Sequence, residues 1–285
     1  MVRYALDMII LSHYQIRLLL AQRESDIRIT SSSADLNLSQ IEVLLTADGV
    51  EYPDGSFLSW RQAETIVAGD NKCFRLQNGQ LQEIRAFSET TGWVRTLYPT
   101  HSAPTTLVSG LTMHRISEID PIEDTRRKIQ AIKPVGRVLD TATGLGYTAI
   151  QAARTAESVL TVEIDPAALD IARQNPWSVD LFNNPHIEIQ IGHAWDVLEE
   201  QAEGSFSRII HDPPALSLGG DLYSGDFYRE LYRVLTRKGR LFHYVGDPES
   251  KSVKRIWDGV LRRLKEAGFS RVEPVRRAYG IVAHR

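Results

Sequence analysis

Cysteine is almost absent from this sequence, which has a single one, Cys73, among 285 residues. One cysteine excludes an internal disulfide framework and a metal site built from several cysteines. We therefore expect a reducing compartment, the cytoplasm. Cys73 also lies far along the chain from the motifs described below. This distance argues against cytosine C5 chemistry, because that chemistry needs a thiolate nucleophile.

Long apolar runs and a strong net charge are missing as well. The apolar stretch from Met8 to Leu20 is interrupted by polar residues, so it predicts an amphipathic helix and neither a membrane span nor a signal peptide. The formal net charge of −3 argues against a dedicated nucleic-acid binder. Residues 233–285, however, carry 14 Lys and Arg against 5 Asp and Glu. This basic end either faces an anionic substrate or forms a solvated surface. No spacing of His, Asp or Glu predicts a metal site.

The order of expected elements divides the chain in two. Residues 1–106 predict a small α+β domain, with β-rich residues 26–93, a hairpin around Asn78-Gly79 and a short helix over 59–67. Residues 98–106 form the expected link. Residues 107–285 alternate strands and helices, which predicts an α/β, Rossmann-like domain with a mostly parallel sheet. Ligands of such sheets bind at the carboxyl ends of the strands.

The second domain can be divided into elements by hydrophobic pattern and by helix-end signals. Asp124 is expected to begin a helix that ends near residue 133. A further helix is expected to end at Lys238-Gly239. The expected strands cover residues 138–140, 158–163, 187–191, 208–211 and 241–245, and a possible antiparallel pair covers 272–275 and 279–283. The helix that is ended by Lys238-Gly239 is expected over 223–235, and one more helix is expected over 253–264.

The most informative stretch is a glycine turn that follows the first of these strands. It reads Asp140-Thr141-Ala142-Thr143-Gly144-Leu145-Gly146-Tyr147-Thr148-Ala149, and its glycines permit backbone angles that are closed to other residues. The turn fits the G-x-G-x-x-G/A pattern of dinucleotide sites, and the acid Glu163 follows it. Asp140, however, ends the strand, and three small residues separate it from Gly144. This offset suits a ligand with an amino-acid end, whose ammonium Asp140 can contact. A turn that serves packing alone is the third alternative.

Polar residues also follow the other strands. Glu163 ends the second strand, where its two oxygens suit paired ribose hydroxyls. His193 follows the third strand and can accept a hydrogen bond only through an unprotonated ring nitrogen. After the fourth strand, two prolines follow His211 and Asp212, and they either fix the Asp212 carboxylate at the cleft or form a structural turn. The motif D/N-P-P-aromatic is typical of amine methyltransferases, but here its last position is Ala215. Candidates to replace the missing ring are Tyr223, Phe227 and Tyr228.

From Leu107 to Ala283 the sequence resembles the class I S-adenosylmethionine-dependent methyltransferases. Within them it is most similar to an archaeal and cyanobacterial group related to spermidine and spermine synthases. The matching segments are Ser109-Gly110, Met113-His114-Arg115, the glycine turn, Asn175-Pro176-Trp177-Ser178, His211-Asp212-Pro213-Pro214, Leu222-Tyr223-Ser224 and Phe242-His243-Tyr244. The resemblance implies S-adenosylmethionine as cofactor and Asp212, His211 and Tyr223 as catalytic candidates. The implied cofactor-binding residues are Met113, Asp140, Thr141, Ala142, Thr143, Gly144, Gly146, Tyr147, Thr148, Glu163, Ile164, His193, Ala194 and Asp212.

The resemblance does not name the methyl acceptor, which is a small molecule or an RNA, and a homo-oligomer is possible. The segment that holds Met113 either folds over the ligand or is a plain linker. Two alternatives to methyl transfer stay open. The first is aminopropyl transfer from decarboxylated S-adenosylmethionine, which needs acids to hold polyamine ammonium groups. The second is a non-catalytic module that binds the cofactor or an RNA.

Overall fold

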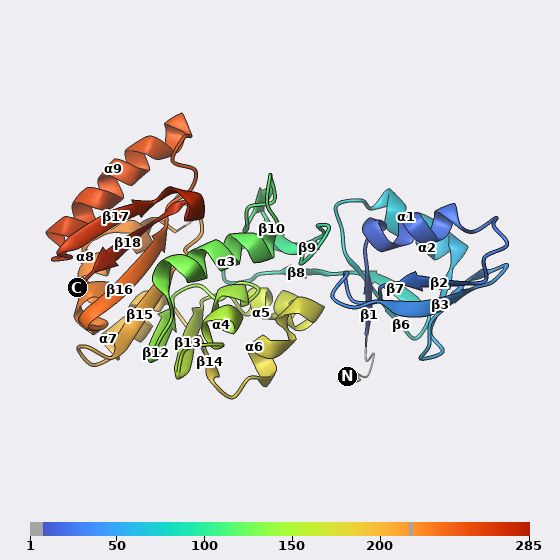
Figure 1. Cartoon of the computed structure of the whole chain (residues 1–285), viewed down its shortest axis with the longest axis horizontal. Coiled ribbons are helices and arrows are strands. Elements are labelled where there is room, and N and C mark those ends of the chain that lie inside the picture. Colours follow the sequence, from blue (N-terminus) through green and yellow to red (C-terminus); the bar gives the residue numbers. More distant parts are fainter. Residues whose placement is uncertain (1–7, 217–218) are drawn as a thin grey trace. The chain divides into compact units, whose positions relative to one another are not determined.

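The computed structural model describes residues 8–216 and 219–285, which form two compact units (Figure 1). The first unit contains residues 1–122 and 170–179, and the second contains residues 123–169 and 180–285. Residues 107–122, which the sequence placed with the second domain, thus group with the first unit. Among the described residues, none of the helices has the length and apolar character needed to cross a membrane.

The first unit is rich in short antiparallel strands, as the sequence predicted. Its sheets have the orders β2-β3-β4-β5, β1-β6-β7 and β11-β10-β9-β8. Helices α1 and α2 pack over a core that includes Ile16, Leu58 and Ile66. The elements are β1 (Ile9–Leu11), α1 (His13–Ala21), β2 (Ile29–Ser32), β3 (Ile41–Leu45), β4 (Gly49–Glu51), β5 (Phe57–Ser59), α2 (Trp60–Ala68), β6 (Phe74–Gln77), β7 (Gln80–Glu83), β8 (Arg85–Phe87), β9 (Val94–Tyr98), β10 (Thr105–Val108), β11 (Leu111–Thr112) and η1 (Pro176–Ser178).

The helix predicted over residues 8–20 is wrong in its first part. The run Ile9–Leu11 is strand β1, which pairs with β6, because an apolar, β-branched run suits a buried strand. Helix α1 begins only after Ser12, whose hydroxyl and backbone form a capping box with Gln15. The segment around Trp177 also belongs to this unit. The indole Nε1 of Trp177 donates to the Leu36 carbonyl at 3.1 Å.

The second unit is a seven-stranded sheet in the order β14-β13-β12-β15-β16-β18-β17. The first five strands are parallel, and β18 runs antiparallel to both of its neighbours. This arrangement confirms the predicted Rossmann-like α/β fold. The elements are α3 (Pro121–Ile132), β12 (Arg137–Asp140), α4 (Tyr147–Ala152), β13 (Ser158–Glu163), α5 (Pro166–Arg173), α6 (Val179–Asn183), β14 (Ile187–Ile191), α7 (Ala194–Glu199), β15 (Phe206–His211), η2 (Gly220–Tyr223), α8 (Gly225–Val234), β16 (Leu235–Tyr244), α9 (Lys251–Glu266), β17 (Arg271–Val275), η3 (Arg276–Ala278) and β18 (Gly280–His284).

Two helix boundaries differ from the sequence prediction. Helix α8 ends at Val234, one residue before the predicted end, but Lys238-Gly239 does not stop it. These two residues lie within β16, where a register shift between β15 and β16 absorbs the extra residues. Helix α3 begins at Pro121, and Asp120 Oδ1 accepts from the Ile122 N–H at 2.8 Å. Asp120 therefore caps the N-terminus of this helix. Asp124, which was predicted to begin it, lies inside the helix.

Candidate active site

The strand order places the carboxyl ends of β12 and β15 side by side. From β12 the chain adds β13 and β14 on one side and then returns to place β15 on the other side. A crevice at such a switch point is the usual ligand site of an open parallel sheet. The last residue of β12, Asp140, pairs with Ile210, and Asp212 follows β15 directly. The fold thus brings together two of the acids that the sequence analysis singled out, Asp140 and Asp212.

Asp140 is fully buried and has one carboxylate oxygen available. Its Oδ2 accepts from Thr148 Oγ1 at 2.8 Å and from Thr161 Oγ1 at 3.3 Å. Its Oδ1 is buried and has no hydrogen-bond partner in the described part of the chain. Burial raises the pKa of Asp140 to about 7. The hydrogen bond from Thr148 opposes this rise, and the charge of Asp212 adds to it. A buried, unpaired carboxylate oxygen is costly, so this atom suits a cationic partner.

The glycine turn that follows Asp140 leaves space over one of its two glycines. Gly144 has φ +53°, and a Cβ placed on it would meet no atom within 4 Å. Gly146 has φ +77°, and a Cβ there would lie 2.6 Å from Leu181. Gly146 is therefore required by its conformation and by packing, whereas the space over Gly144 is free for a ligand.

Glu163, at the end of β13, is held by two backbone N–H groups, one of which belongs to the glycine turn. Its Oε2 accepts from the Gly144 N–H at 2.9 Å, and its Oε1 accepts from the Asp165 N–H at 3.0 Å. Backbone groups of the turn and of the following segment thus fix the position of this carboxylate. The next residue, Ile164, is 43% exposed and offers an apolar surface beside it.

His193 caps helix α7 through its ring. Its Nδ1 accepts from the Trp195 N–H at 3.2 Å, which leaves the proton of the neutral imidazole on Nε2. The other ring nitrogen, Nε2, is therefore a donor. The sequence had considered His193 as an acceptor.

Asp212 belongs to a buried ionic cluster that the sequence did not predict. Lys128 Nζ lies 2.6 Å from Asp212 Oδ2 and 2.8 Å from Asp124 Oδ2. It also lies 4.5 Å from the centroid of the Tyr244 ring, a cation–π distance. We call these residues the lysine cluster: Lys128, Asp124, Asp212 and Tyr244.

Neighbouring charges and burial shift the pKa of Lys128 in opposite directions. Burial alone would lower the pKa of Lys128, but the carboxylates of Asp212 and Asp124 outweigh it and raise that pKa, so Lys128 stays protonated. Burial raises the pKa of the Asp212 carboxyl. The positive charge of Lys128 opposes this rise, and the negative charge of Asp124 adds to it. Among residues 8–216 and 219–285, no donor reaches Asp212 Oδ1, and the side chain is 16% exposed. Lys128 thus engages Oδ2, and the Asp212 side chain keeps some contact with solvent.

His211 and Tyr223 are both held within the core. His211 Nε2 donates to the Leu222 carbonyl at 3.0 Å, so its Nδ1 accepts from Thr141 Oγ1 at 2.7 Å. Burial lowers the pKa of His211 to about 3, so the ring is neutral and both nitrogens are engaged. The Tyr223 hydroxyl donates to the Pro214 carbonyl at 3.2 Å, and burial raises its pKa. Both side chains support the backbone around Asp212.

The other predicted residues divide between the two units. Thr143 Oγ1 lies 2.8 Å from Thr161 Oγ1, and Ala194 packs in the core. Met113 lies in the first unit. Cys73 is fully buried in that unit, and burial raises the pKa of its thiol, so it remains protonated. The candidate site of the second unit thus contains Asp140, Thr141, Ala142, Thr143, Gly144, Gly146, Tyr147, Thr148, Glu163, Ile164, His193, Ala194, His211, Asp212 and Tyr223.

Comparisons with known proteins agree with this site. MJ1233 of Methanocaldococcus jannaschii, an uncharacterized protein, is 41% identical over 236 residues, which are 82% of this chain and 80% of MJ1233. The two proteins are members of one family. Residues 126–257 match the family model for a methyltransferase small domain. Over these residues the chain belongs to the methyltransferase small domain family.

Polyamine enzymes are more distant relatives of this methyltransferase-family chain. A polyamine aminopropyltransferase of Aeropyrum pernix is 27% identical over 133 residues, 45% of this chain and 40% of that protein. The crystal structure of a spermidine synthase with the transition state analogue AdoDATO superposes with a TM-score of 0.59 at 16% identity, over 72% of this chain and 75% of that chain. At this identity the likeness concerns the fold alone.

The residues present fit S-adenosylmethionine, the cofactor of this family. The cofactor has a cationic amino-acid end, and the unpaired Asp140 Oδ1 is an anionic acceptor at the strand tip. It also has a ribose, whose hydroxyls suit a carboxylate such as Glu163, and the open space over Gly144 admits a ligand. This agreement of charge, donors and space favours S-adenosylmethionine over a dinucleotide.

The raised pKa of Asp140 predicts that cofactor affinity depends on pH. Below about pH 7 the carboxyl of the free protein holds a proton, which must leave before the carboxylate can pair with an ammonium. We expect the affinity for S-adenosylmethionine to fall by up to about tenfold per pH unit as the pH drops from 7 to 5. Calorimetry across this range measures it. A flat profile in wild type, or the same slope in Asp140→Asn, would contradict the assignment.

Proposed function

We propose that the protein transfers the methyl group of S-adenosylmethionine to a nucleophile that faces Asp212. The observation that carries the choice of reaction is the ion pair between Lys128 and Asp212. An aminopropyl acceptor is a polyamine, and its ammonium groups need carboxylates. In the lysine cluster, an ammonium between two carboxylates and beside an aromatic ring is already present, and it is the chain's own Lys128. This internal ammonium takes the position that a polyamine would need.

Each group of the site has a part in this proposal. S-adenosylmethionine supplies a methyl group that its sulfonium has already activated. Asp140 binds the ammonium of the cofactor, Glu163 holds the ribose hydroxyls, and Ile164 contacts the adenine face. His193 donates from Nε2 to an adenine ring nitrogen. These contacts fix the direction from which an acceptor can approach, and alignment of this kind accounts for much of the rate.

Asp212 takes the proton that the acceptor loses. Its Oδ1 accepts a hydrogen bond from an N–H or O–H of the acceptor while Lys128 holds the other oxygen. A carboxyl whose pKa is raised is a stronger base than an ordinary one. His211 and Tyr223 act as positioning residues, because their hydrogen bonds to Thr141, the Leu222 carbonyl and the Pro214 carbonyl hold the loop that carries Asp212.

Aminopropyl transfer is the second candidate, supported by the distant polyamine relatives. The two reactions differ in the product that is left from the cofactor. Methyl transfer leaves S-adenosylhomocysteine, whereas aminopropyl transfer leaves 5′-methylthioadenosine.

The test incubates the protein with S-adenosylmethionine and a desalted cell extract, and separately with decarboxylated S-adenosylmethionine and putrescine or spermidine. Chromatography then identifies the product, and calorimetry compares the affinities for the two cofactors. We expect S-adenosylhomocysteine only, from the first mixture, and tighter binding of S-adenosylmethionine. Release of 5′-methylthioadenosine would favour the second candidate. Asp212→Asn is expected to bind the cofactor normally and to lose turnover, which separates acceptor chemistry from cofactor binding.

A further inference from the structure

Four arginines lie at the same edge of the second unit's sheet as Asp212. We call Arg126, Arg127, Arg276 and Arg277 the arginine rim. Arg276 and Arg277 begin η3, which connects β17 to β18. The first residue of β18, Gly280, pairs with Tyr244, the last residue of β16. Because β16 and β15 are parallel neighbours that end together, η3 lies at the edge where Asp212 follows β15.

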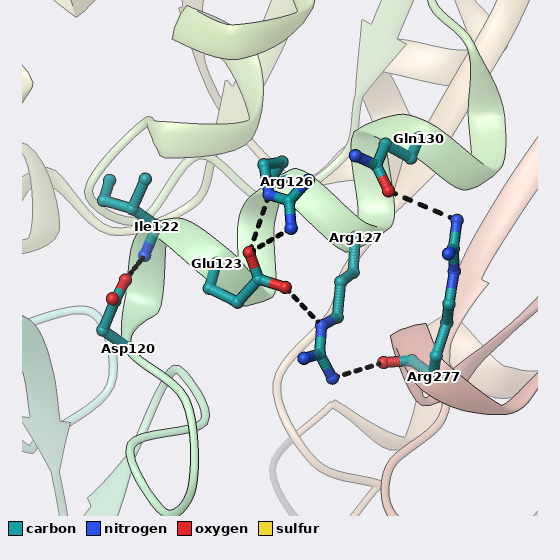
Figure 2. Close-up of polar contacts among 7 residues, drawn as sticks. All are labelled: Asp120, Ile122, Glu123, Arg126, Arg127, Gln130 and Arg277. Carbon is teal, nitrogen blue, oxygen red and sulfur yellow. Dashed lines mark hydrogen bonds and ion pairs between the residues drawn. The ribbon is translucent and has the colours of Figure 1, made fainter.

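The two halves of the rim are joined by hydrogen bonds (Figure 2). Arg127 Nη1 donates to the Arg277 carbonyl at 3.4 Å, and Arg277 Nη2 donates to Gln130 Oε1 at 3.2 Å. The next residue along α3 is Lys128, whose Nζ contacts Asp212. Adjacent positions on one helix thus bind the carboxylate that faces the acceptor and the loop that carries two of the arginines.

Carboxylates balance only part of this charge. Glu123 pairs with both Arg126 and Arg127 (Figure 2), and Glu249 pairs with Arg276. Glu123 is shared by Arg126 and Arg127, so one carboxylate serves two guanidinium groups. The side chains of Arg126 and Arg276 are 58% and 76% exposed. A guanidinium has five N–H donors, and a carboxylate engages only some of them. The rim therefore keeps donors for an anion from solution.

We propose that the methyl acceptor carries phosphate, which the arginine rim binds while the nucleophile of the acceptor faces Asp212 Oδ1. This inference rests on the proposed function and names the class of its acceptor. Planar guanidinium groups match the oxygens of phosphate in pairs, which favours phosphate over other anions at a cluster of arginines. A phosphodiester of RNA and a phosphorylated small molecule share this chemistry, and the experiment distinguishes them.

The test measures binding of a short fluorescein-labelled single-stranded RNA by anisotropy at several salt concentrations, with inorganic pyrophosphate as competitor. The test variant is Arg276→Gln/Arg277→Gln. The matched control, Arg262→Gln/Lys265→Gln, removes two exposed charges from α9 near its C-terminal end, away from the rim. We expect the rim variant to bind at least about tenfold more weakly at low salt. Its salt dependence, as the slope of log affinity against log salt, should fall by about 1.4, because each contact with single-stranded RNA contributes about 0.7.

The control variant is expected to bind within about twofold of wild type. Displacement of the RNA by pyrophosphate at similar concentrations identifies a small phosphorylated acceptor, whereas displacement by RNA alone identifies a polynucleotide. The proposal is overturned if both double variants weaken binding equally, or if wild type binds neither probe. Calorimetry separates this outcome from failure of the proposed function. The rim variant should keep its affinity for S-adenosylmethionine, and Asp140→Asn should lose that affinity yet bind RNA normally. A wild type that binds RNA at the rim but no S-adenosylmethionine would reject the proposed function, and with it the rim as an acceptor site.

Discussion

Replacing Lys128 with Met is expected to lower the free energy of unfolding by about 3–5 kcal/mol, the usual cost of removing one partner of a buried ion pair. Lys128 is 1% exposed and lies between Asp124 and Asp212. A methionine of similar length fills the same volume but leaves two carboxylates close together with no cation. Both must then take up protons or draw in water. Urea denaturation at neutral pH measures the loss.

Two further variants test the explanation. Arg126→Met removes a charge from the same helix, but its ion pair with Glu123 is exposed, so we expect a change below about 1 kcal/mol. The double variant Lys128→Met/Asp124→Asn removes one carboxylate along with the lysine and should recover part of the stability. If Lys128→Met were no less stable than Arg126→Met, the lysine cluster would not be the buried ionic centre described above.

Replacing Asp140 with Asn is expected to reduce the affinity for S-adenosylmethionine by about ten- to a hundredfold. A hydrogen bond between charged groups contributes about 1.5–3 kcal/mol, and tenfold in affinity corresponds to about 1.4 kcal/mol. Asparagine preserves the size of the side chain and can keep an acceptor for Thr148 and Thr161, but it has no charge for an ammonium. Calorimetry with S-adenosylmethionine and S-adenosylhomocysteine measures the loss.

The same variant should be as stable as wild type or more stable when the cofactor is absent. Because the pKa of Asp140 is raised in the folded protein, the folded state holds a proton that the unfolded state has released between pH 3.8 and about 7. The contribution of this group to stability therefore falls as the pH rises through that window, and Asp140→Asn removes the fall. Asp196→Asn, an exposed acid on α7, serves as the control and should change neither property. Lower stability of Asp140→Asn would mean that lost binding reflects damage to the fold.

Much of the second unit could be predicted from local pattern. Alternating apolar strands and capped helices predicted β13 and β14 with their observed bounds, and the glycine turn predicted the position of the site. Boundaries failed where the deciding interaction is distant in sequence. The strand Ile9–Leu11 depends on pairing with β6, and Lys238-Gly239 falls inside β16 because of a register shift against β15.

The candidate site was predictable where its residues follow strands and was missed where they lie on a helix. Asp140, Glu163 and Asp212 each stand at or just after the end of a strand, so topology brings them to one edge. Lys128 stands on α3, for which the sequence predicted a helix but no part in the site. A signal was present, because Asp124, Lys128 and Ile132 are spaced four apart and therefore share one face of the helix. Ile132 marks that face as buried, but the partner that makes a buried lysine tolerable is 84 residues away.

The strand order also implies a sequence of events during synthesis of the chain. The two acids proposed to bind the cofactor, Asp140 and Glu163, lie on strands that are adjacent in the chain as well as in the sheet, so this half can assemble early. The part of the site that holds Asp212 cannot assemble early. Strand β15 follows β13 and β14 in the chain and must pair with β12 on its other side. Until then Lys128 has only Asp124, its neighbour on α3. Pairings between distant segments form slowly. We therefore expect a nascent or truncated chain to gain its cofactor-facing residues before it gains the place where an acceptor binds.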